Sequence, residues 1–237
     1  MARNHSLWDR RSRRTRVKLC EFESLDAAYP AALAGADALG FHIFRHHDVA
    51  YKVKLFSMIF AHLPPCTNKT LLTDLDRQQL EDEVMAPLAW DSVQLYPDWS
   101  PAEVRAFRER IGDVRILKVM SAQTNENVVD DRAFLARYQD VADAILLDSF
   151  RAGGTGKLAD LDHCRDIVAI SPLPVFLAGG LTVDNVGAAI ERVQPFGVDV
   201  ETGVSDRIPG GPLIKNLDKC TRFLGAVRVH DVAAGRI

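Results

Sequence analysis

Short apolar runs and longer amphipathic segments alternate along the whole chain. An apolar run of four to nine residues that ends at Gly, Pro or a charged residue is typical of a strand buried on both faces. The pattern predicts strands at residues 16–20, 36–44, 70–73, 92–95, 114–119 and 144–147, and two more that begin near Val175 and Val198.

A helical segment follows each predicted strand. The predicted helices cover residues 25–34, 51–62, 77–86, 101–110, 131–139, 160–169, 183–193 and 215–227. Ser100 before Pro101 is a good N-cap, Thr182 is a candidate cap for 183–193, and Gly35 ends 25–34. Pro30 lies inside the first helix and predicts a kink or a late start.

Strict alternation of strand and helix indicates a parallel sheet, and eight units in 237 residues indicate closure into a single (β/α)₈ TIM barrel. We expect the barrel to span residues 16–237, with no internal linker. Residues 1–15 contain Arg10, Arg11, Arg13 and Arg14 without apolar periodicity, so we expect a basic, flexible N-terminal arm.

The composition adds little to this picture and excludes some classes of protein. Hydrophobic content of 47% and a net charge of −3 are ordinary for a soluble domain. No apolar run reaches the length of a membrane span, and no aromatic-interleaved basic pattern follows the arginine-rich start. The four cysteines lack metal-site or disulfide spacing. We therefore expect a cytoplasmic protein with no nucleic-acid or membrane partner.

Three of the predicted strands end in glycine-containing loops. Asp148 closes one strand and Gly-Gly-Thr-Gly-Lys follows at 153–157; Gly179 and Gly180 follow the next, and Thr202 and Gly203 the last. Glycines let backbone N–H groups approach an anion closely. Short glycine runs are also common in ordinary turns, but three at consecutive strand ends predict an anion-binding site.

Acid–base chemistry is the second expectation. Barrel enzymes carry their chemistry at the carboxyl ends of the strands, where Cys20 and Asp148 would both lie. A thiolate can remove a proton while a carboxylic acid supplies one. The alternative for Cys20 is a small buried apolar residue. The adjacent His46 and His47 are poorly spaced for joint metal ligation and are interpreted as loop residues.

In eight segments the chain resembles the phosphoribosylanthranilate isomerase family of (β/α)₈ barrels. The segments are 17–20, 35–41, 93–95, 146–149, 153–157, 177–181, 184–186 and 198–204. They run in order from about residue 16 toward the C-terminus, and so cover nearly the whole barrel.

The resemblance implies an Amadori rearrangement of an N-(5-phosphoribosyl)amine, with Cys20 as general base and Asp148 as general acid. It implies no metal or organic cofactor, because the imine formed from the sugar serves as the electron sink. Expected phosphate-binding residues are Gly154, Thr155, Gly156, Gly179, Gly180, Thr202 and Gly203, and expected substrate contacts are Lys18, Arg45, His47, Gln94 and Tyr96. The partner is a phosphorylated sugar amine, and the protein is expected as a monomer or homodimer.

The sequence departs from the family pattern around this core. Glu-Phe-Glu at 21–23 replaces Gly-Ile-Thr, and the arginine that holds the anthranilate carboxylate after the second strand is absent, with Arg45 nearby. Tyr96-Pro97 replaces His-Gly, Glu201 stands where serine is usual, and 210–214 replaces a Gly-x-Lys-Asp segment.

Three functions remain open from the sequence. The chain is a phosphoribosylanthranilate isomerase with a divergent aromatic pocket, a related isomerase acting on another sugar or phosphosugar amine, or a non-catalytic ligand-binding barrel. Retention of Cys20 and Asp148 disfavours the third, whereas the missing arginine favours the second over the first.

Overall fold

Eight parallel strands close into a barrel in the computed structural model, which describes residues 6–121, 131–148, 160–209 and 211–237. The strands are β1 Arg16–Leu19, β2 Ala38–Ile43, β3 Asn68–Thr73, β4 Ser92–Leu95, β5 Arg115–Ser121, β6 Ala144–Asp148, β7 Val175–Leu177 and β8 Gly197–Val200. They pair in chain order, and β1 also pairs with β8, which closes the sheet. The predicted (β/α)₈ barrel is confirmed.

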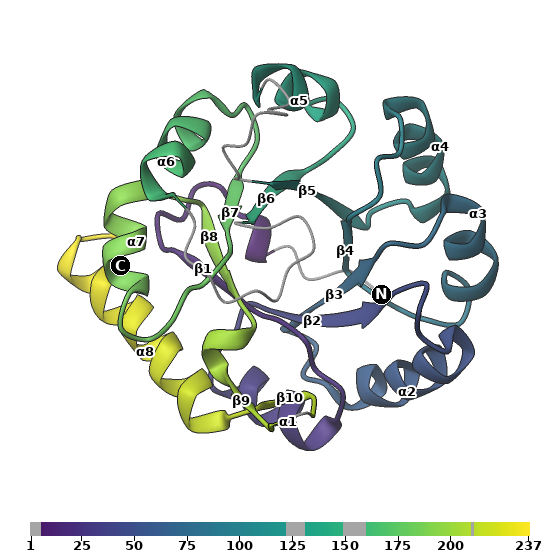
Figure 1. The fold of residues 1–237 in the computed structure, drawn as a ribbon, viewed down its shortest axis with the longest axis horizontal. Helices are drawn as coiled ribbons and strands as arrows, with labels where there is room; N and C mark the ends of the chain where they lie inside the picture. Colours follow the sequence, from purple (N-terminus) through teal and green to yellow (C-terminus); the bar gives the residue numbers. More distant parts are fainter. Residues whose placement is uncertain (1–5, 122–130, 149–159, 210) are drawn as a thin grey trace.

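Helices surround the strands as an outer ring (Figure 1). They are α1 Leu25–Leu33, α2 Val49–His62, α3 Arg77–Gln79 with the wider turn η2 Leu80–Val84, α4 Pro101–Ile111, α5 Asp131–Tyr138, α6 Leu161–Ile170, α7 Val186–Val193 and α8 Leu217–Ala233. Ser100 caps α4 in a reciprocal capping box with Glu103, as the sequence predicts. The helix α1 continues through Pro30. Among the described residues, no helix is both long and apolar enough to cross a bilayer.

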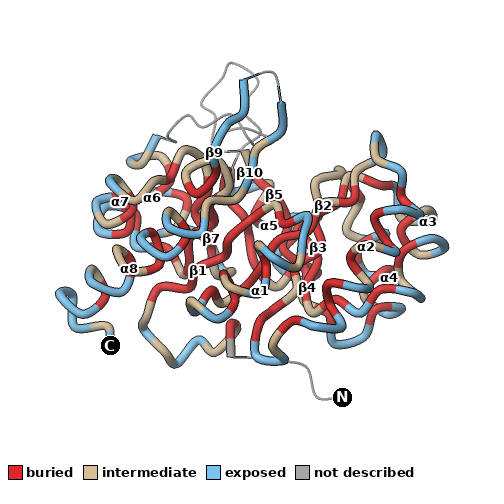
Figure 2. Tube along the Cα trace, turned by 90° about the horizontal axis from the view of Figure 1, so that it is seen from below, coloured by how far each residue is buried: buried red, intermediate tan, exposed pale blue. Residues whose placement is uncertain are grey.

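Two predicted boundaries near the C-terminus are wrong. Thr182 does not cap a helix at 183; α7 begins at Val186, because the Asn185 side chain accepts a hydrogen bond from the Thr182 N–H at 2.8 Å and holds the preceding loop in a turn. The last helix begins at Leu217, because Leu213–Lys215 forms strand β10. It pairs with β9, Ser205–Arg207, in an antiparallel hairpin that projects from the top of the barrel in Figure 2.

Alternation along the strands separates two apolar cores. Side chains that point outward, such as Leu19, Phe41 and Ile145, pack with the helices in the larger core. Side chains that point inward form a smaller core inside the barrel: Ala38, Leu117, Val119, Ala144, Leu146, Phe176 and Ala178. The inward positions beyond this core, toward the carboxyl ends of the strands, are the ones available for chemistry.

The N-terminal segment belongs to the inner core. The short turn η1, Ser6–Trp8, lies within the ring of strands (Figure 1), with Leu7 only 2% exposed. Trp8 packs edge-on against Phe176 at 5.9 Å between ring centroids. The buried Arg16 guanidinium donates to the carbonyls of Asp9, Ser12 and Arg14 and lies over the Phe196 ring. Leu7, Trp8 and Thr15 therefore pack against the barrel, in a segment that the sequence analysis expected to be flexible, whereas Arg10, Arg11 and Arg13 are exposed.

Removing the Leu7 side chain should destabilise the barrel. Leu7→Ala should lower the free energy of unfolding by about 2–5 kcal/mol, the range for an apolar side chain lost from a core. Arg13→Ala changes an exposed residue of the same segment and should have little effect. Urea denaturation of both variants measures the difference. Equal stability of the two would show that the segment is not part of the core.

Candidate active site

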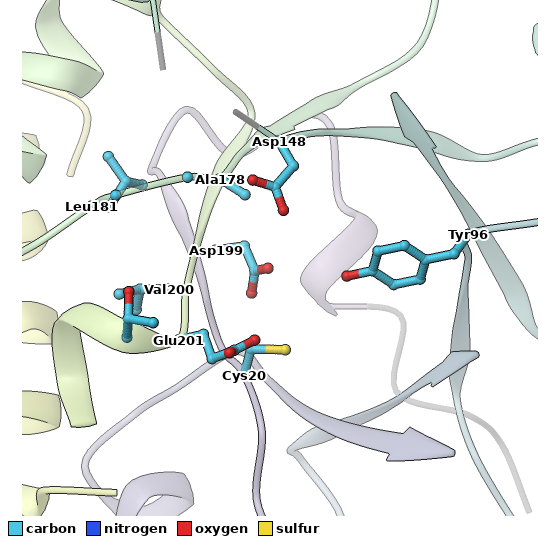
Figure 3. A pocket seen from close by; sticks show the side chains of 11 residues that line it. Cys20, Tyr96, Asp148, Ala178, Leu181, Asp199, Val200 and Glu201 are labelled. Atoms are coloured by element: carbon cyan, nitrogen blue, oxygen red, sulfur yellow. The ribbon is translucent and has the colours of Figure 1, made fainter. Parts of the chain in front are cut away.

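One pocket lies at the carboxyl ends of the strands. It encloses about 420 Å³, part of it open to solvent. Its lining residues are Cys20, Tyr96, Asp148, Ala178, Gly179, Gly180, Leu181, Asp199, Val200, Glu201 and Thr202. In Figure 3 the carboxyl groups of Asp148, Asp199 and Glu201, the Tyr96 ring and the Cys20 thiol all converge on this space. The expected meeting of Cys20 and Asp148 at the barrel mouth is therefore present.

The Cys20 thiol is buried at the end of β1, with its residue 1% exposed. Its Sγ lies 3.2 Å from the Lys18 ammonium and 3.4 Å from Nε2 of His42. Gly40 makes this fit possible, because a Cβ at that position would lie 2.7 Å from the sulfur. Burial raises the pKa of the Cys20 thiol, and Lys18 offsets only part of that rise. Without a ligand, the thiol is protonated at neutral pH.

Lys18 lies below the pocket and does not line it. Its ammonium contacts the carboxylate of Asp199 at 2.8 Å, and the residues are 1% and 7% exposed. Burial opposes the charge, but Asp199 and Cys20 outweigh it, so the pKa of Lys18 rises. Lys18 is therefore a buried cation held between the thiol and a carboxylate, at a position that the sequence analysis assigned to substrate contact.

A pair of carboxyl groups lies next to the thiol. Burial, and then the neighbouring Glu21, raise the pKa of Glu201 to about 7. Burial also raises the pKa of Glu21, whose side chain is hydrogen-bonded to Glu201. The Glu201 Oε2 lies 3.9 Å from His42 Nε2. Burial and the cations Lys18 and Lys215 lower the pKa of His42, so the imidazole is neutral.

The opposite wall of the pocket presents Asp148 and Tyr96. Asp148 is 7% exposed at the end of β6. The Tyr96 hydroxyl accepts a hydrogen bond from Gln94 Nε2 at 3.1 Å, and burial raises the pKa of this phenol. The buried Lys118 ammonium donates to the carbonyls of Tyr96 and Pro97 at 3.4 and 2.9 Å. These contacts fix the loop after β4 and hold the Tyr96 ring at the pocket.

The glycine loops contribute part of the expected anion site. Gly179 and Gly180 have φ of 92° and 66°, a left-handed turn that favours glycine, and both line the pocket with Thr202. The Asn185 side chain donates to the Gly180 carbonyl at 2.9 Å and so stabilises the turn. Gly203 follows in η3, Thr202–Val204, outside the lining. The expected residues Gly154, Thr155 and Gly156 lie outside the described residues.

Three further expected substrate contacts lie away from the pocket lining. Arg45 is exposed, and its guanidinium Nε lies 3.2 Å from the Asp74 carboxylate. The His47 Nδ1 accepts a hydrogen bond from the Phe44 N–H at 3.1 Å. Gln94 is buried beneath Tyr96, and its Oε1 has no hydrogen-bond partner among the described residues. Among the expected substrate contacts, Tyr96 alone lines the pocket.

Two residues at the site have no role in the sequence-based assignment: His42 and Asp199. Glu201 is noted there only as a departure from the family pattern. The register pairs Lys18 with Asp199 across the seam between β1 and β8. Since inward positions recur every second residue, Asp199 and Glu201 share the inward face. Alternation along β2 and β8 is the signal that could have identified all three.

A closed (β/α)₈ barrel that gathers a thiol, carboxyl groups and glycine loops at its strand ends has the architecture of barrel enzymes, whose active sites lie at this face. The family model described as N-(5'phosphoribosyl)anthranilate (PRA) isomerase matches residues 74–224. The chain belongs to this family.

Individual relatives agree over most of the chain. An N-(5'-phosphoribosyl)anthranilate isomerase from Haloferax volcanii is 34% identical over 90% of this chain and 93% of its own length. Isomerase 2 from Methanosarcina mazei is 32% identical over 81% and 86%. The crystal structure of the Thermotoga maritima enzyme superposes with a TM-score of 0.73 at 26% identity, covering 91% of this chain and 99% of that one.

The raised pKa of Glu201 predicts a pH-dependent stability. Its pKa is about 7 in the fold against an ordinary 4.5, so the folded state retains a proton that the unfolded state releases. This contribution to stability is fully present below pH 4.5 and is lost as the pH rises to about 7.

Urea denaturation across this pH range should show the decline in the wild type and a flatter profile in Glu201→Gln. Glu109→Gln, at an exposed position of α4, is the matched control and should follow the wild type. A Glu201→Gln profile that also follows the wild type would contradict the assignment.

Proposed function

We propose that this chain is a phosphoribosylanthranilate isomerase-type enzyme that converts an N-(5-phosphoribosyl)amine into a 1-amino-1-deoxyketose. The observation that carries the proposal is the placement of Cys20 and Asp148 in one pocket of the barrel. Family membership supports it, as does a related isomerase at 26% identity whose crystal structure is a complex with reduced 1-(o-carboxyphenylamino)-1-deoxyribulose 5-phosphate.

The two groups divide the proton transfers of the reaction. Asp148 donates a proton to the ring oxygen, the bond between that oxygen and C1 breaks, and the nitrogen lone pair forms an iminium. The Cys20 thiolate then removes the proton on C2 to give an enolamine. Tautomerisation returns a proton to C1 and leaves the ketose. The iminium accepts the electron pair, so these steps need no cofactor.

The reaction requires the thiol to ionise once substrate is bound. Burial favours the neutral thiol in the free protein. An iminium in the pocket adds a positive charge near the sulfur, and a nearby opposite charge favours a thiolate. The Lys18 ammonium at 3.2 Å acts in the same direction. Substrate therefore assists in generating the base that deprotonates it.

Phosphate recognition is assigned to the glycine loops. Gly179, Gly180 and Thr202 line the same pocket as the acid–base pair, and backbone N–H groups are suitable donors to a phosphate. Glu201 shares that lining, and its carboxylate would repel a dianion. Its raised pKa keeps part of the population neutral near pH 7, which is the state compatible with phosphate.

A second candidate function differs in the amine portion of the substrate. A buried aromatic carboxylate needs a cationic partner. Arg45 is bonded to Asp74 and exposed, so it does not supply that partner in this conformation. This observation favours a related isomerase that acts on an amine other than anthranilate, with the same acid–base pair.

Substitution of either proton-transfer group should abolish most of the activity. Cys20→Ala and Asp148→Asn should each lower kcat by about 10²-fold or more on phosphoribosylanthranilate, the usual scale for general acid–base groups. Cys66→Ser, at an exposed cysteine, is the matched control and should retain activity. Near-normal kcat in either active-site variant would contradict the assigned role.

Arg45 separates the two candidate substrates. If the chain uses anthranilate without Arg45, it should restore growth of a tryptophan auxotroph that lacks the isomerase. Because Asp74 holds Arg45 at the surface, Arg45→Ala should then change kcat/KM by less than about threefold, under 1 kcal/mol. A loss of tenfold or more would show that Arg45 binds the carboxylate. No growth from soluble, folded protein would favour the other amine.

A further inference from the structure

Three metal-ligating side chains meet at this site: Cys20, which is the proposed catalytic base, His42 and Glu201. Cys20 Sγ, a ring nitrogen of His42 and a carboxylate oxygen of Glu201 all lie within 4.8 Å of one another. The sulfur is 3.4 Å from His42 Nε2, and that nitrogen is 3.9 Å from the Glu201 Oε2. His42 has no role in the proposed isomerisation mechanism.

These separations are close to those of a zinc site. Bond lengths of about 2.0–2.3 Å at tetrahedral angles place zinc ligands about 3.3–3.6 Å apart. The Cys20–His42 pair already has this spacing, and the Glu201 carboxylate would move closer to both to complete the site. The three residues lie at β1, β2 and β8, and β1 pairs with both of the other strands. The closed sheet therefore fixes the spacing of the three backbones.

The charge of the pocket favours a dication. Cys20, Asp148, Asp199 and Glu201 line the pocket, and each of these groups can become an anion. Lys18 pairs with Asp199 at 2.8 Å, and Lys52 pairs with Glu23. Among the described residues, the pocket lining contains these four acidic groups and no lysine or arginine, so it suits a cation.

The donor set identifies the class of metal. A thiolate with an imidazole suits zinc and similar borderline-soft ions, whereas magnesium and calcium prefer oxygen ligands alone. The Lys18 ammonium can keep its hydrogen bond to a metal-bound sulfur, and Asp199 at 2.8 Å balances its charge. Since Cys20 and Glu201 line the pocket, a fourth ligand position would open toward the substrate space.

We propose that Cys20, His42 and Glu201 form a three-ligand Zn²⁺ site, and that zinc inhibits the enzyme by occupying its base. Binding forms the Zn–S bond and releases the thiol proton to solvent; no electron transfer is involved. The binding site stands independently of the reaction, and the inhibition rests on the proposed function. Donation to zinc lowers the basicity of the thiolate that would remove the C2 proton, so turnover requires metal-free protein.

Cobalt provides a direct test of the site. Titration of the reduced, metal-free full chain with Co²⁺ should give one equivalent of tight binding and a thiolate-to-cobalt charge-transfer band, which Zn²⁺ then displaces. Cys20→Ser should lose the band. His42→Phe, which keeps a ring beside Phe44, and Glu201→Gln should each weaken binding by about tenfold or more. Cys66→Ser should bind cobalt as the wild type does.

Other outcomes would overturn the proposal. These are the absence of a one-equivalent band in the wild type, a band that survives Cys20→Ser, or unchanged affinity in folded His42→Phe and Glu201→Gln. If a variant fails to fold, the thermal midpoint of the metal-free wild type decides: zinc that binds the folded state should raise it, and an unchanged midpoint in excess Zn²⁺ would refute the site.

Measuring isomerase turnover in the presence of zinc tests the zinc site and the proposed isomerase function separately. Zinc should inhibit phosphoribosylanthranilate isomerisation by the wild type, and at least tenfold more zinc should be needed with His42→Phe. An inactive chain that still shows the cobalt band retains the site and loses the proposed function. An active chain without the band retains the function and loses the site.

Discussion

The buried ion pair between Lys18 and Asp199 is the interaction on which the active site depends. It joins the first and last strands at the seam where the barrel closes, since the two residues are register partners of β1 and β8. Removing either partner would leave an uncompensated charge inside the barrel, a loss of about 3–5 kcal/mol. The pair also places an ammonium 3.2 Å from the Cys20 sulfur, so the contact that closes the barrel also helps ionise the base.

The surroundings of that base carry an excess of acid. Glu21 and Glu201 lie partly buried beside each other, which raises the pKa of both carboxyl groups, that of Glu201 to about 7. A site that must accept a phosphorylated substrate gains from this, because neutral carboxyl groups do not repel the phosphate. The cost is a pocket that becomes strongly negative once those protons are lost, and such a pocket attracts cations.

Local patterns in the sequence were sufficient to predict the barrel, but they did not predict the burial of the N-terminal segment or the β9–β10 hairpin. Hydrophobic periodicity and capping signals such as Ser100-Pro101 depend on residues that are close in sequence, so they could be predicted. The burial of Leu7 could not be predicted in this way, because it depends on an interior that all eight strands form together. Likewise, the β9–β10 hairpin is held by pairing between segments that carry no strong alternation.

The same contrast between local signals and long-range pairing applies to the active-site residues. Cys20 and Asp148 could be predicted because each closes an apolar strand, and strand ends meet at one face of a barrel. His42 and Asp199 could not be assigned roles, since their meaning depends on which strands become neighbours around the ring. Arg45 is a different case: proximity in sequence suggested a substrate contact, whereas the loop after β2 directs its guanidinium to Asp74.

Substrate and zinc would therefore act on the Glu201 proton in opposite directions. A bound phosphate favours the neutral form of Glu201, because a second negative charge nearby raises the cost of ionisation. Zinc favours the ionised form of Glu201, because this carboxyl group must lose its proton to become a ligand. Each ligand weakens the other even where the two do not touch, since linkage through shared protons is reciprocal. The acidic residues that distinguish this pocket thus couple its substrate affinity to its metal affinity.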